Sequence, residues 1–446
     1  MRRHITLIIA LLVSQAGLAQ PTAFVNVNVV PMSSEVVVEE QTVVVNVGVI
    51  VALGPVDEVP IPKDAIVIDG TDRFLMPGLA EMHAHVPAID SDNLDRYFSL
   101  YAANGVTTVR GMLGQGSHID LRKQLLAGTV FGPRLVTSGP SLNGRSVAGV
   151  AQARQIVRDQ HHSGYDFIKI HPGLTSDEFD AIAETANELG MPFAGHVPVA
   201  AGVERALQLN MATIDHLDGY LAAMLPASSV GSGGYGGFFD VMLADELDEG
   251  RIPQIARATA EAGTWNVPTQ VLVEVRIDAT PVSELRNRPE MRYMPKAAVE
   301  RWAAAKETLL AERDFDPEIA TLAIELRRRL ILELHKAGAG LLLGSDSPQV
   351  FNVPGFSVHE ELDALVAAGL TPYEALRTGT VAVAEFLRGN TGVVAVGRDA
   401  DLVLLDASPL DDVRNAQRIH GVVLRGTWYS SESLAERLSR YAGSDN

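Results

Sequence analysis

The sequence of 446 residues contains no cysteine. Without cysteine the protein forms no disulfide, so its stability must come from its packed core and from bound metal. The same absence excludes thiolate metal sites, thiol nucleophiles and a lipid attached through an N-terminal cysteine. Any metal site must therefore use histidine, carboxylate or modified lysine ligands, which suit zinc, manganese, cobalt or iron.

Positive charge is also scarce. The chain has 36 lysine and arginine residues against 55 aspartate and glutamate residues, a formal net charge of −19 at pH 7. Nucleic acids and anionic membranes both attract a basic face. We therefore expect neither nucleic acid nor a membrane surface as a partner.

Long apolar runs are missing, and the first 19 residues have the pattern of an export signal. Arg2 and Arg3 form a basic start, residues 5–13 form a short apolar core, and small residues follow at 16–19. The core is too short to cross a bilayer, which needs about 20 residues, and no later run reaches that length. We expect cleavage after Ala19, export to the periplasm or out of the cell, and no membrane insertion afterwards. A buried N-terminal helix is the alternative.

Both ends of the mature chain have the composition of β-structure. Residues 20–75 and 391–446 contain alternating valine-rich or leucine-rich runs, such as Phe24–Val29, Val43–Val47 and Asp401–Leu405. This pattern predicts one small β-sandwich built from the two chain ends.

The middle of the chain, residues 76–390, alternates apolar runs with helical patterns such as Ser176–Leu189 and Ile319–Ala337. Such alternation is typical of βα units around a parallel sheet. Eight strand candidates end near His85, Arg110, Gly139, His171, His196, His216, Gln270 and Asp346. The predicted fold class is therefore α/β, with a (β/α)8 TIM-type barrel and the small sandwich beside it.

Polar residues close several of these runs, where a barrel carries its chemistry. His83 and His85 are two residues apart, so both imidazoles lie on one face of a strand and can hold one metal. Two ordinary surface histidines are the alternative. The other polar residues at run ends are Lys169, His196, His216 and Asp346. For each histidine taken singly, the alternative to metal binding is a structural role in the core. For Lys169, the alternative is a salt bridge.

The ordered set of motifs resembles the amidohydrolase superfamily, within it the imidazolonepropionase-like and prolidase-like branch. The resemblance extends from about Phe24 to Leu424. Its motifs are Met76-Pro77-Gly78-Leu79, His83-Ala84-His85, Phe167-Ile168-Lys169-Ile170, Gly195-His196, Ile214-Asp215-His216, Gly344-Ser345-Asp346-Ser347 and the tail Gly397 to Val403. The resemblance implies two divalent metal ions, with Zn2+ expected. The implied ligands are His83, His85 and Asp346 for one metal, His196 and His216 for the other, and a CO2-derived carbamate on Lys169 as a bridge.

A lysine among histidine ligands is useful only if its charge is removed, because an ammonium repels a dication. A carbamate anion has two oxygens and fits between metals about 3.5–4 Å apart. A metal pair lowers the pKa of a bridging water from about 15.7 to about 7, so hydroxide can attack an amide carbonyl. Asp346 is then expected to be both a ligand and the general acid/base. Its alternative role is a helix N-cap in Ser345–Pro348.

The substrate expected from the resemblance is a small amide or peptide, such as a dipeptide or an N-acyl amino acid. Candidate substrate-binding residues are polar groups at other strand ends: Arg110, Arg145, Tyr220 and Gln270. An arginine can bind a carboxylate through two hydrogen bonds. Each of these residues has a solvated or packing role as its alternative.

Two long segments, near 220–247 and 278–316, are expected to cover the site as lids that favour a hydrophobic group. The first contains the glycine-rich stretch 231–237. Disordered linkers are the alternative.

Other functions remain open at this point. They are a cyclic amide, lactone or imidazolone-type ring hydrolase, a deaminase, and a non-catalytic binding protein on the same fold. The deaminase class generally lacks the bridging lysine, and binding proteins usually lose metal ligands. The resemblance also implies a homo-oligomer.

Overall fold

The computed structural model describes residues 20–226 and 238–443. The predicted export signal, residues 1–19, and the glycine-rich stretch 231–237 lie outside these ranges and stay predictions. Within the described ranges, no helix combines the length and apolar character needed to cross a membrane.

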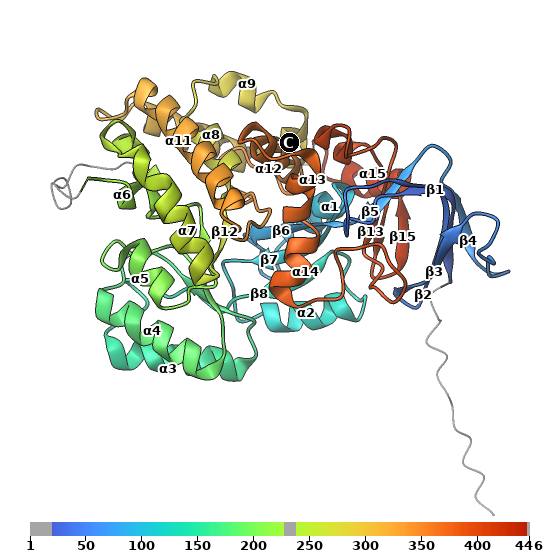
Figure 1. The fold of residues 1–446 in the computed structure, drawn as a ribbon, viewed down its shortest axis with the longest axis horizontal. Coiled ribbons are helices and arrows are strands. Elements are labelled where there is room, and N and C mark those ends of the chain that lie inside the picture. Colours follow the sequence, from blue (N-terminus) through green and yellow to red (C-terminus); the bar gives the residue numbers. More distant parts are fainter. Residues whose placement is uncertain (1–19, 227–237, 444–446) are drawn as a thin grey trace, which may run out of the picture.

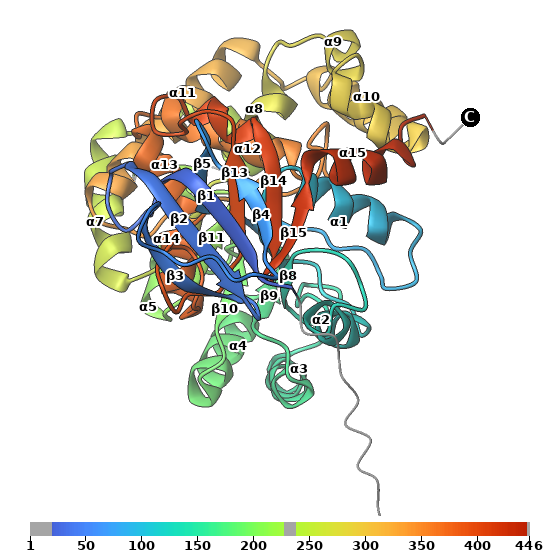
Figure 2. The same cartoon turned by 90° about the vertical axis from the view of Figure 1, so that its right-hand side faces the viewer.

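The two chain ends meet in one eight-stranded mixed sheet. Its order is β15-β14-β13-β5-β1-β2-β3, and β4 pairs with β1. Antiparallel pairing of β5 with β13 joins the ends. Figures 1 and 2 show the blue and red strands together at one end of the molecule. The strands are β1 (Thr22–Val29), β2 (Val38–Asn46), β3 (Val49–Pro55), β4 (Ile66–Asp69), β5 (Phe74–Pro77), β13 (Leu402–Leu405), β14 (Ile419–Leu424) and β15 (Thr427–Ser430).

Alternating apolar side chains explain why these ends form strands. Phe24, Val43 and Leu404 are buried with nine other residues in a core of their own. The Phe24 ring meets the edge of Trp428 at 5.4 Å between centroids, so the two chain ends share this core. A sandwich requires two separate sheets packed face to face. Here hydrogen bonds connect all eight strands into one sheet, so the predicted sandwich is not confirmed.

Seven of the eight runs predicted in the middle of the chain are strands, and each pairs in parallel with its neighbours. They form a three-stranded and a four-stranded sheet. Helices separate most of them along the chain, so the α/β fold class is confirmed. The strands are β6 (Leu79–Ala84), β7 (Val106–Gly111), β8 (Arg134–Thr137), β9 (Ile168–Ile170), β10 (Phe193–Gly195), β11 (Thr213–Asp215) and β12 (Trp265–Val267).

The helices between and after these strands surround the parallel sheets (Figure 1). Helix α4 shows why such segments are helical: Thr175 and Glu178 form a capping box at its start, and a left-handed glycine follows its end. The longer helices are α1 (Asn93–Ala103), α2 (His118–Leu126), α3 (Val150–Ser163), α4 (Ser176–Leu189), α7 (Ile252–Ala262), α8 (Gln270–Ile277), α10 (Lys296–Leu310), α11 (Pro317–Lys336), α12 (Phe356–Ala367) and α15 (Ser431–Ser439). The shorter ones are α5 (Gly202–Gln208), α6 (Tyr220–Ala223), α9 (Val282–Arg286), α13 (Pro372–Thr378), α14 (Val381–Leu387), η1 (Phe238–Glu246), η2 (Glu249–Arg251), η3 (Pro289–Tyr293) and η4 (Val413–Gln417).

The eighth predicted strand, which leads to Asp346, is not a regular strand. Its β-pairing consists of isolated parallel bridges at Leu341 and Ser347, and the backbone of Leu343 also bonds to Met82 and Thr378. Between the two bridges, the amide of Ser345 donates to the Glu81 carboxylate, at 2.9 Å to Oε1, instead of to a neighbouring backbone carbonyl. The predicted strand is therefore not formed as a regular strand, because the buried Glu81 carboxylate replaces a backbone carbonyl as the acceptor.

The segment 278–316 forms helices α9, η3 and α10. Its aromatic residues pack onto the chain that follows Asp346: Tyr293 stacks on Phe356, and Trp302 meets Phe351 edge-on, each at 6.1 Å between ring centroids. These rings therefore have structural neighbours, and a role of this segment as a lid stays a prediction.

Candidate active site

Three histidines and one aspartate converge at the ends of strands β6 and β11 and of residues 341–347, which we call the bridged segment. His85 Nε2 lies 3.1 Å from Asp346 Oδ1, and His83 Nε2 lies 3.6 Å from the same oxygen. His216 Nδ1 lies 3.9 Å from Asp346 Oδ2. Ligand atoms of His83, His85 and Asp346 all lie within 4.8 Å of one another, which is close enough to hold one metal ion.

His196 and Lys169 join the same group. The His83 and His216 rings are 4.4 Å apart between centroids, and the His216 and His196 rings 4.8 Å. Lys169 Nζ lies 3.8 Å from Asp215 Oδ2, and this oxygen is 3.1 Å from His83 Nδ1. The structure thus brings all six sequence-predicted ligands into one group, which we call the His–Lys–Asp group. Its members are His83, His85, Lys169, His196, His216 and Asp346.

Two members of the group adopt a backbone conformation that is uncommon for residues with a side chain. His216 has φ +63° and Asp346 has φ +61°. Such left-handed residues cost free energy, and strained residues cluster at functional sites. The buried Arg327 stabilises the turn after β11, because it donates to the carbonyl oxygens of His216 at 2.8 Å and Pro268 at 3.1 Å.

Lys169 is accommodated by a glycine on the neighbouring strand. Gly195 has φ +120°, and a Cβ at this position would lie 2.8 Å from Lys169 Cδ and 2.5 Å from the carbonyl oxygen of Ile170. Both distances are too short for a real contact. Only glycine leaves room for the lysine side chain in this place.

Burial sets the protonation of the group. It lowers the pKa of His85 to about 4, and it lowers the pKa of His83 and His216 well below the ordinary value. Burial also lowers the pKa of Lys169 to about 8 and raises that of Asp346. The histidines are therefore neutral at pH 7, and only neutral imidazole has a lone pair for a metal.

Four buried polar atoms of this region form no hydrogen bond within the described part of the chain, although two of them, His83 Nδ1 and Asp215 Oδ2, face each other at 3.1 Å; the other two are Lys169 Nζ and Asp346 Oδ1. Buried polar groups are normally paired, and each unpaired one costs about 1–3 kcal/mol. Neutral imidazole nitrogens together with carboxylate oxygens are a donor set that binds divalent cations such as zinc. The residues present therefore fit a metal site.

The sequence patterns did not predict the carboxylate residues that hold the proposed metal ligands in place. Asp218 Oδ2 lies 3.0 Å from His196 Nδ1, and Glu81 accepts a hydrogen bond of 2.8 Å from the backbone N–H of His83. Burial raises the pKa of Glu81 to about 7. Asp215 stands inside the motif Ile214-Asp215-His216 but had no assigned role. A carboxylate in an apolar strand beside a ligand was the available signal, since outer carboxylates commonly orient metal-binding histidines.

None of the four predicted substrate-binding residues contributes a side chain to the His–Lys–Asp group. Tyr220 is fully buried, and its hydroxyl bonds to Thr259 and Asn266. Gln270 is also buried; it accepts from Arg327 and donates to Glu274. Both already have partners within the protein, so the structure gives them structural roles instead.

The two predicted arginines are also placed differently from expectation. The Arg110 guanidinium is buried and donates to Met82 O at 2.6 Å, Thr213 Oγ1 at 3.2 Å and Asp215 Oδ1 at 3.2 Å. Arg110 therefore supports the group from beneath, with no free edge for a substrate. Arg145 is exposed in a turn held by Asn143.

Two pockets lie near the ends of the strands. One of about 630 Å3 adjoins the His–Lys–Asp group through Asp218 and Asp240, and apolar side chains such as Val197, Val203 and Leu207 line it. The other, about 370 Å3, contains Trp265 and Leu341, where β12 and the bridged segment begin. It therefore lies at the opposite ends of these strands from His216 and Asp346.

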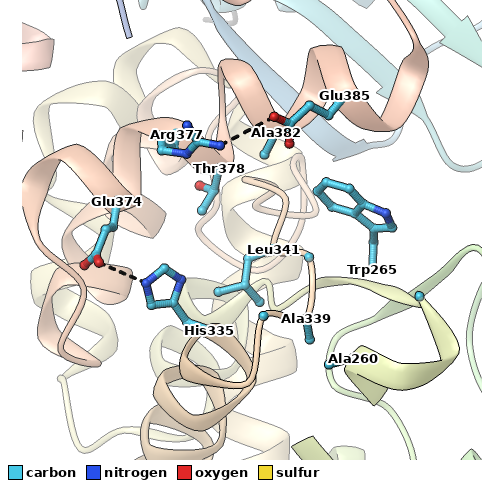
Figure 3. Close-up of a pocket in the computed structure, with 13 residues that line it drawn as sticks. Ala260, Trp265, His335, Ala339, Leu341, Glu374, Arg377, Thr378, Ala382 and Glu385 are labelled. Atoms are coloured by element: carbon cyan, nitrogen blue, oxygen red, sulfur yellow. Dashed lines mark ion pairs between the residues drawn. The ribbon is translucent and has the colours of Figure 1, made fainter. Parts of the chain in front are cut away.

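The charged side chains of the second pocket are already paired. His335 Nε2 lies 3.0 Å from Glu374 Oε1, and Arg377 lies 3.6 Å from Glu385 (Figure 3). No member of the His–Lys–Asp group is among its lining residues. The candidate active site is therefore the His–Lys–Asp group and not this pocket.

Solved structures with the same fold include several hydrolases. Bottromycin amidohydrolase matches with a TM-score of 0.73 at 23% identity, over 94% of this chain and 90% of that one. A Xaa-Pro dipeptidase with bound methionine matches with a TM-score of 0.64 at 19% identity, over 92% of this chain and 100% of that one. The ochratoxinase of A. niger matches with a TM-score of 0.65 at 19% identity, over 92% and 96%. These likenesses show the fold. Comparison with curated proteins gave no match.

The amidohydrolase family model matches residues 74–429, which include β5 to β14 and the whole His–Lys–Asp group. That match covers most of the chain, and the family consists of metal-dependent hydrolases. This protein belongs to the amidohydrolase family and is a hydrolase that acts on carbon–nitrogen bonds.

Proposed function

We propose that this protein is an exported amidohydrolase with two metal ions, which cleaves the amide bond of a dipeptide or an N-acyl amino acid. The observation that carries the proposal is the His–Lys–Asp group, which together with Asp215 contains four buried polar atoms that donate or accept no hydrogen bond among the described residues. Export rests on the sequence of residues 1–19 alone. The substrate class is supported by the likeness to bottromycin amidohydrolase and a Xaa-Pro dipeptidase.

The proposed ligand assignment is the one that the family resemblance implies, and the proximity of His83, His85 and Asp346 supports its first part. His83, His85 and Asp346 would hold one metal, and His196 and His216 the other, with zinc the proposed ion in both places. Lys169 would bridge them as a carbamate. Its fully buried amine has a pKa lowered to about 8 by burial, so a usable fraction is neutral near pH 7.5. A neutral amine adds CO2 and releases one proton, and the resulting anion balances part of the metal charge.

Asp346 would transfer the proton in the reaction. When bound, divalent cations supply Lewis acidity and lower the pKa of a water. Asp346 accepts a proton from the attacking water while that oxygen bonds to the amide carbonyl carbon. It then returns the proton to the leaving nitrogen as the carbon–nitrogen bond breaks.

We also propose that the parallel strands form one (β/α)8 barrel over residues 76–390. Three isolated parallel bridges support this: Ser138 with Phe167, Asn266 with Leu341, and Ala84 with Ser347. They lie between the two parallel sheets and at both ends of residues 341–347, the places where a closed barrel would require strand pairing. The shared core of the chain ends supports a separate small domain of sandwich type, made of residues 20–75 and 391–446.

Metal analysis of the Lys169→Ala variant tests the function. Wild-type protein loaded with zinc in bicarbonate should contain two metals per chain and hydrolyse members of a panel of dipeptides and N-acyl amino acids. The variant should contain one or none and lose the activity. Lys123→Ala, which removes an exposed surface lysine, is the control and should match the wild type.

One metal in both proteins, with the Lys169→Ala variant still active, would overturn the bridged site. The same panel should then be repeated with cyclic amides, lactones and amino-substituted heterocycles, since a site with one metal is typical of ring hydrolases and deaminases.

A further inference from the structure

A second feature of the site involves Arg276 on helix α8. The start of this helix is held by the buried Glu361, which accepts hydrogen bonds from the backbone N–H groups of Gln270 at 3.0 Å and Val271 at 2.7 Å. The Arg276 Cζ lies 4.2 Å from the centre of the Phe238 ring, a cation–π contact. Its Nε is buried and has no hydrogen-bond partner within residues 20–226 and 238–443.

A chain of aromatic contacts connects Arg276 to the His–Lys–Asp group. The rings of Phe238 and Phe239 are 4.4 Å apart between centroids. The Phe239 ring stacks on His216 at 4.9 Å and on His196 at 5.9 Å. Phe239 therefore lies directly against two proposed metal ligands, and Phe238 separates it from the guanidinium.

The backbone at this point is strained, as is common where a side chain has a functional position. Phe239 has φ +52° and the next residue, Asp240, has φ +59°. Left-handed conformation costs a phenylalanine roughly 1–2 kcal/mol. The fold tolerates this strain, which places the Phe239 ring over His196 and His216.

Burial lowers the pKa of the Arg276 guanidinium, and the negative charge of Asp346 is one of the two that oppose this shift. Glu312 is the other acidic group that acts on Arg276. Neither carboxylate accepts a hydrogen bond from the Arg276 Nε, which donates to no residue that the structure describes.

The other cations of this region already have partners or a different role. Arg110 donates to three protein oxygens beneath the group, and Arg327 donates to His216, Pro268 and Gln270. Lys169 is a member of the His–Lys–Asp group. A substrate with a free carboxylate needs a cation whose donors are not all taken by the protein, and the buried Nε of Arg276 donates to none of the described residues.

We propose that Arg276 is a specificity-determining residue that binds the free carboxylate of the substrate. Phe238 holds the plane of the guanidinium, and Phe239 forms the wall along which the substrate lies between Arg276 and the metal ligands. The ligand class is an N-acyl amino acid or a dipeptide, bound through its carboxylate. This inference rests on the proposed amide hydrolysis and adds the group that selects the substrate.

Kinetics on a matched pair of substrates tests the inference. The pair is an N-acyl amino acid and the same compound with its carboxylate converted to the primary amide. Wild-type enzyme loaded with zinc should prefer the carboxylate by roughly 10- to 100-fold in kcat/KM, the range expected for hydrogen bonds to a charged group. In Arg276→Met the preference should fall below threefold, mainly through a higher KM.

Two further variants separate binding from folding. Arg276→Lys keeps the charge but loses the fork of donors, so it should retain part of the preference. Arg158→Met removes an exposed arginine of α3 and should keep the full preference. Melting temperatures of all the proteins show whether Arg276→Met is folded.

Binding of the product supplies a readout that does not depend on turnover. Calorimetry with the product amino acid and its amide should show roughly 10-fold or greater weakening of carboxylate binding in Arg276→Met. Equal losses on both substrates, or no preference in the wild type, would overturn the inference while leaving amide hydrolysis intact. If the wild type cleaves neither substrate, the proposed function fails, and unchanged binding of the amino acid in the variant would then overturn the role of Arg276 as well.

Discussion

Arg110 and Asp215 form a buried ion pair directly beneath the candidate metal ligands, with 3.2 Å between Arg110 Nη2 and Asp215 Oδ1. The other carboxylate oxygen, Oδ2, lies 3.1 Å from His83 Nδ1. Both charged side chains are at most 1% exposed. The arginine thus holds one oxygen while the second faces the ligand histidine, an arrangement that orients an imidazole toward a metal.

This relationship predicts the effect of Asp215→Asn. The substitution keeps the shape but removes the charge that faces His83, so the affinity for zinc should fall roughly 10- to 100-fold. Equilibrium dialysis against zinc measures it. Asp180→Asn is the control, because Asp180 pairs with Arg205 at 2.7 Å on the surface. Equal affinities in wild type and Asp215→Asn would show that Asp215 does not orient the ligand.

Gly195→Ala should damage the site more than a comparable substitution elsewhere. The new Cβ would lie 2.8 Å from Lys169 Cδ and 2.5 Å from a carbonyl oxygen, so the lysine must move. We expect a loss of roughly 1–3 kcal/mol in the free energy of unfolding, together with reduced zinc content. Urea unfolding and metal analysis measure the two effects.

Gly190→Ala is the matched control for that substitution. Gly190 has φ +65°, but nothing lies within 4 Å of the added Cβ. The variant should lose only the roughly 1–2 kcal/mol of left-handed strain and keep its zinc. If both variants retain full zinc content, the space beside Lys169 is not what the glycine provides.

Removal of metal should destabilise the wild-type protein. A ligand that binds only the folded state stabilises it by about 2.7 kcal/mol at a concentration 100 times its Kd. Protein treated with a chelator should therefore melt at a lower temperature, and added zinc should restore the original value. Lys169→Ala should show a smaller difference between the two states. Identical melting curves with and without zinc in the wild type would contradict a metal site.

His359 predicts a pH dependence that is independent of the metal group. Its Nε2 lies 3.0 Å from Asn104 O, and burial lowers its pKa to about 4. An unfolded histidine titrates near pH 6.5. Between pH 6.5 and 4 the unfolded chain binds a proton that the folded protein does not. The free energy of unfolding therefore falls as the pH falls, by at most about 3 kcal/mol from this residue.

The variant His359→Gln isolates that contribution. Glutamine can still donate to the carbonyl of Asn104 but does not titrate, so stability should fall less steeply with acid than in the wild type. Denaturant unfolding at several pH values between 4 and 7 measures the difference between the two slopes. His161→Gln, at an exposed position, is the control for the substitution itself. Parallel slopes for wild type and His359→Gln would contradict the prediction.

The periodicity of the sequence by itself determined the strands and the residues at their ends. Alternating apolar residues predict the strands of both chain ends, and short apolar runs predict the parallel strands from β6 to β12. Strand periodicity also places His83 and His85 on one face, and the polar residues at strand ends lie in one group because parallel strands end at the same edge. These features are local or repeat along the chain, so they can be read without coordinates.

Only the tertiary structure decided the partners of the long and buried polar side chains. Arg110 and Tyr220 stand at predicted strand ends, yet the fold directs them to Asp215 and Asn266 in the interior. Arg276 carries no motif, and the fold brings it over Phe238, 38 positions earlier in the chain. The physical reason is that a buried charge or hydroxyl must find a partner wherever packing places one. Such partners come from distant segments, and local sequence patterns contain no information about them.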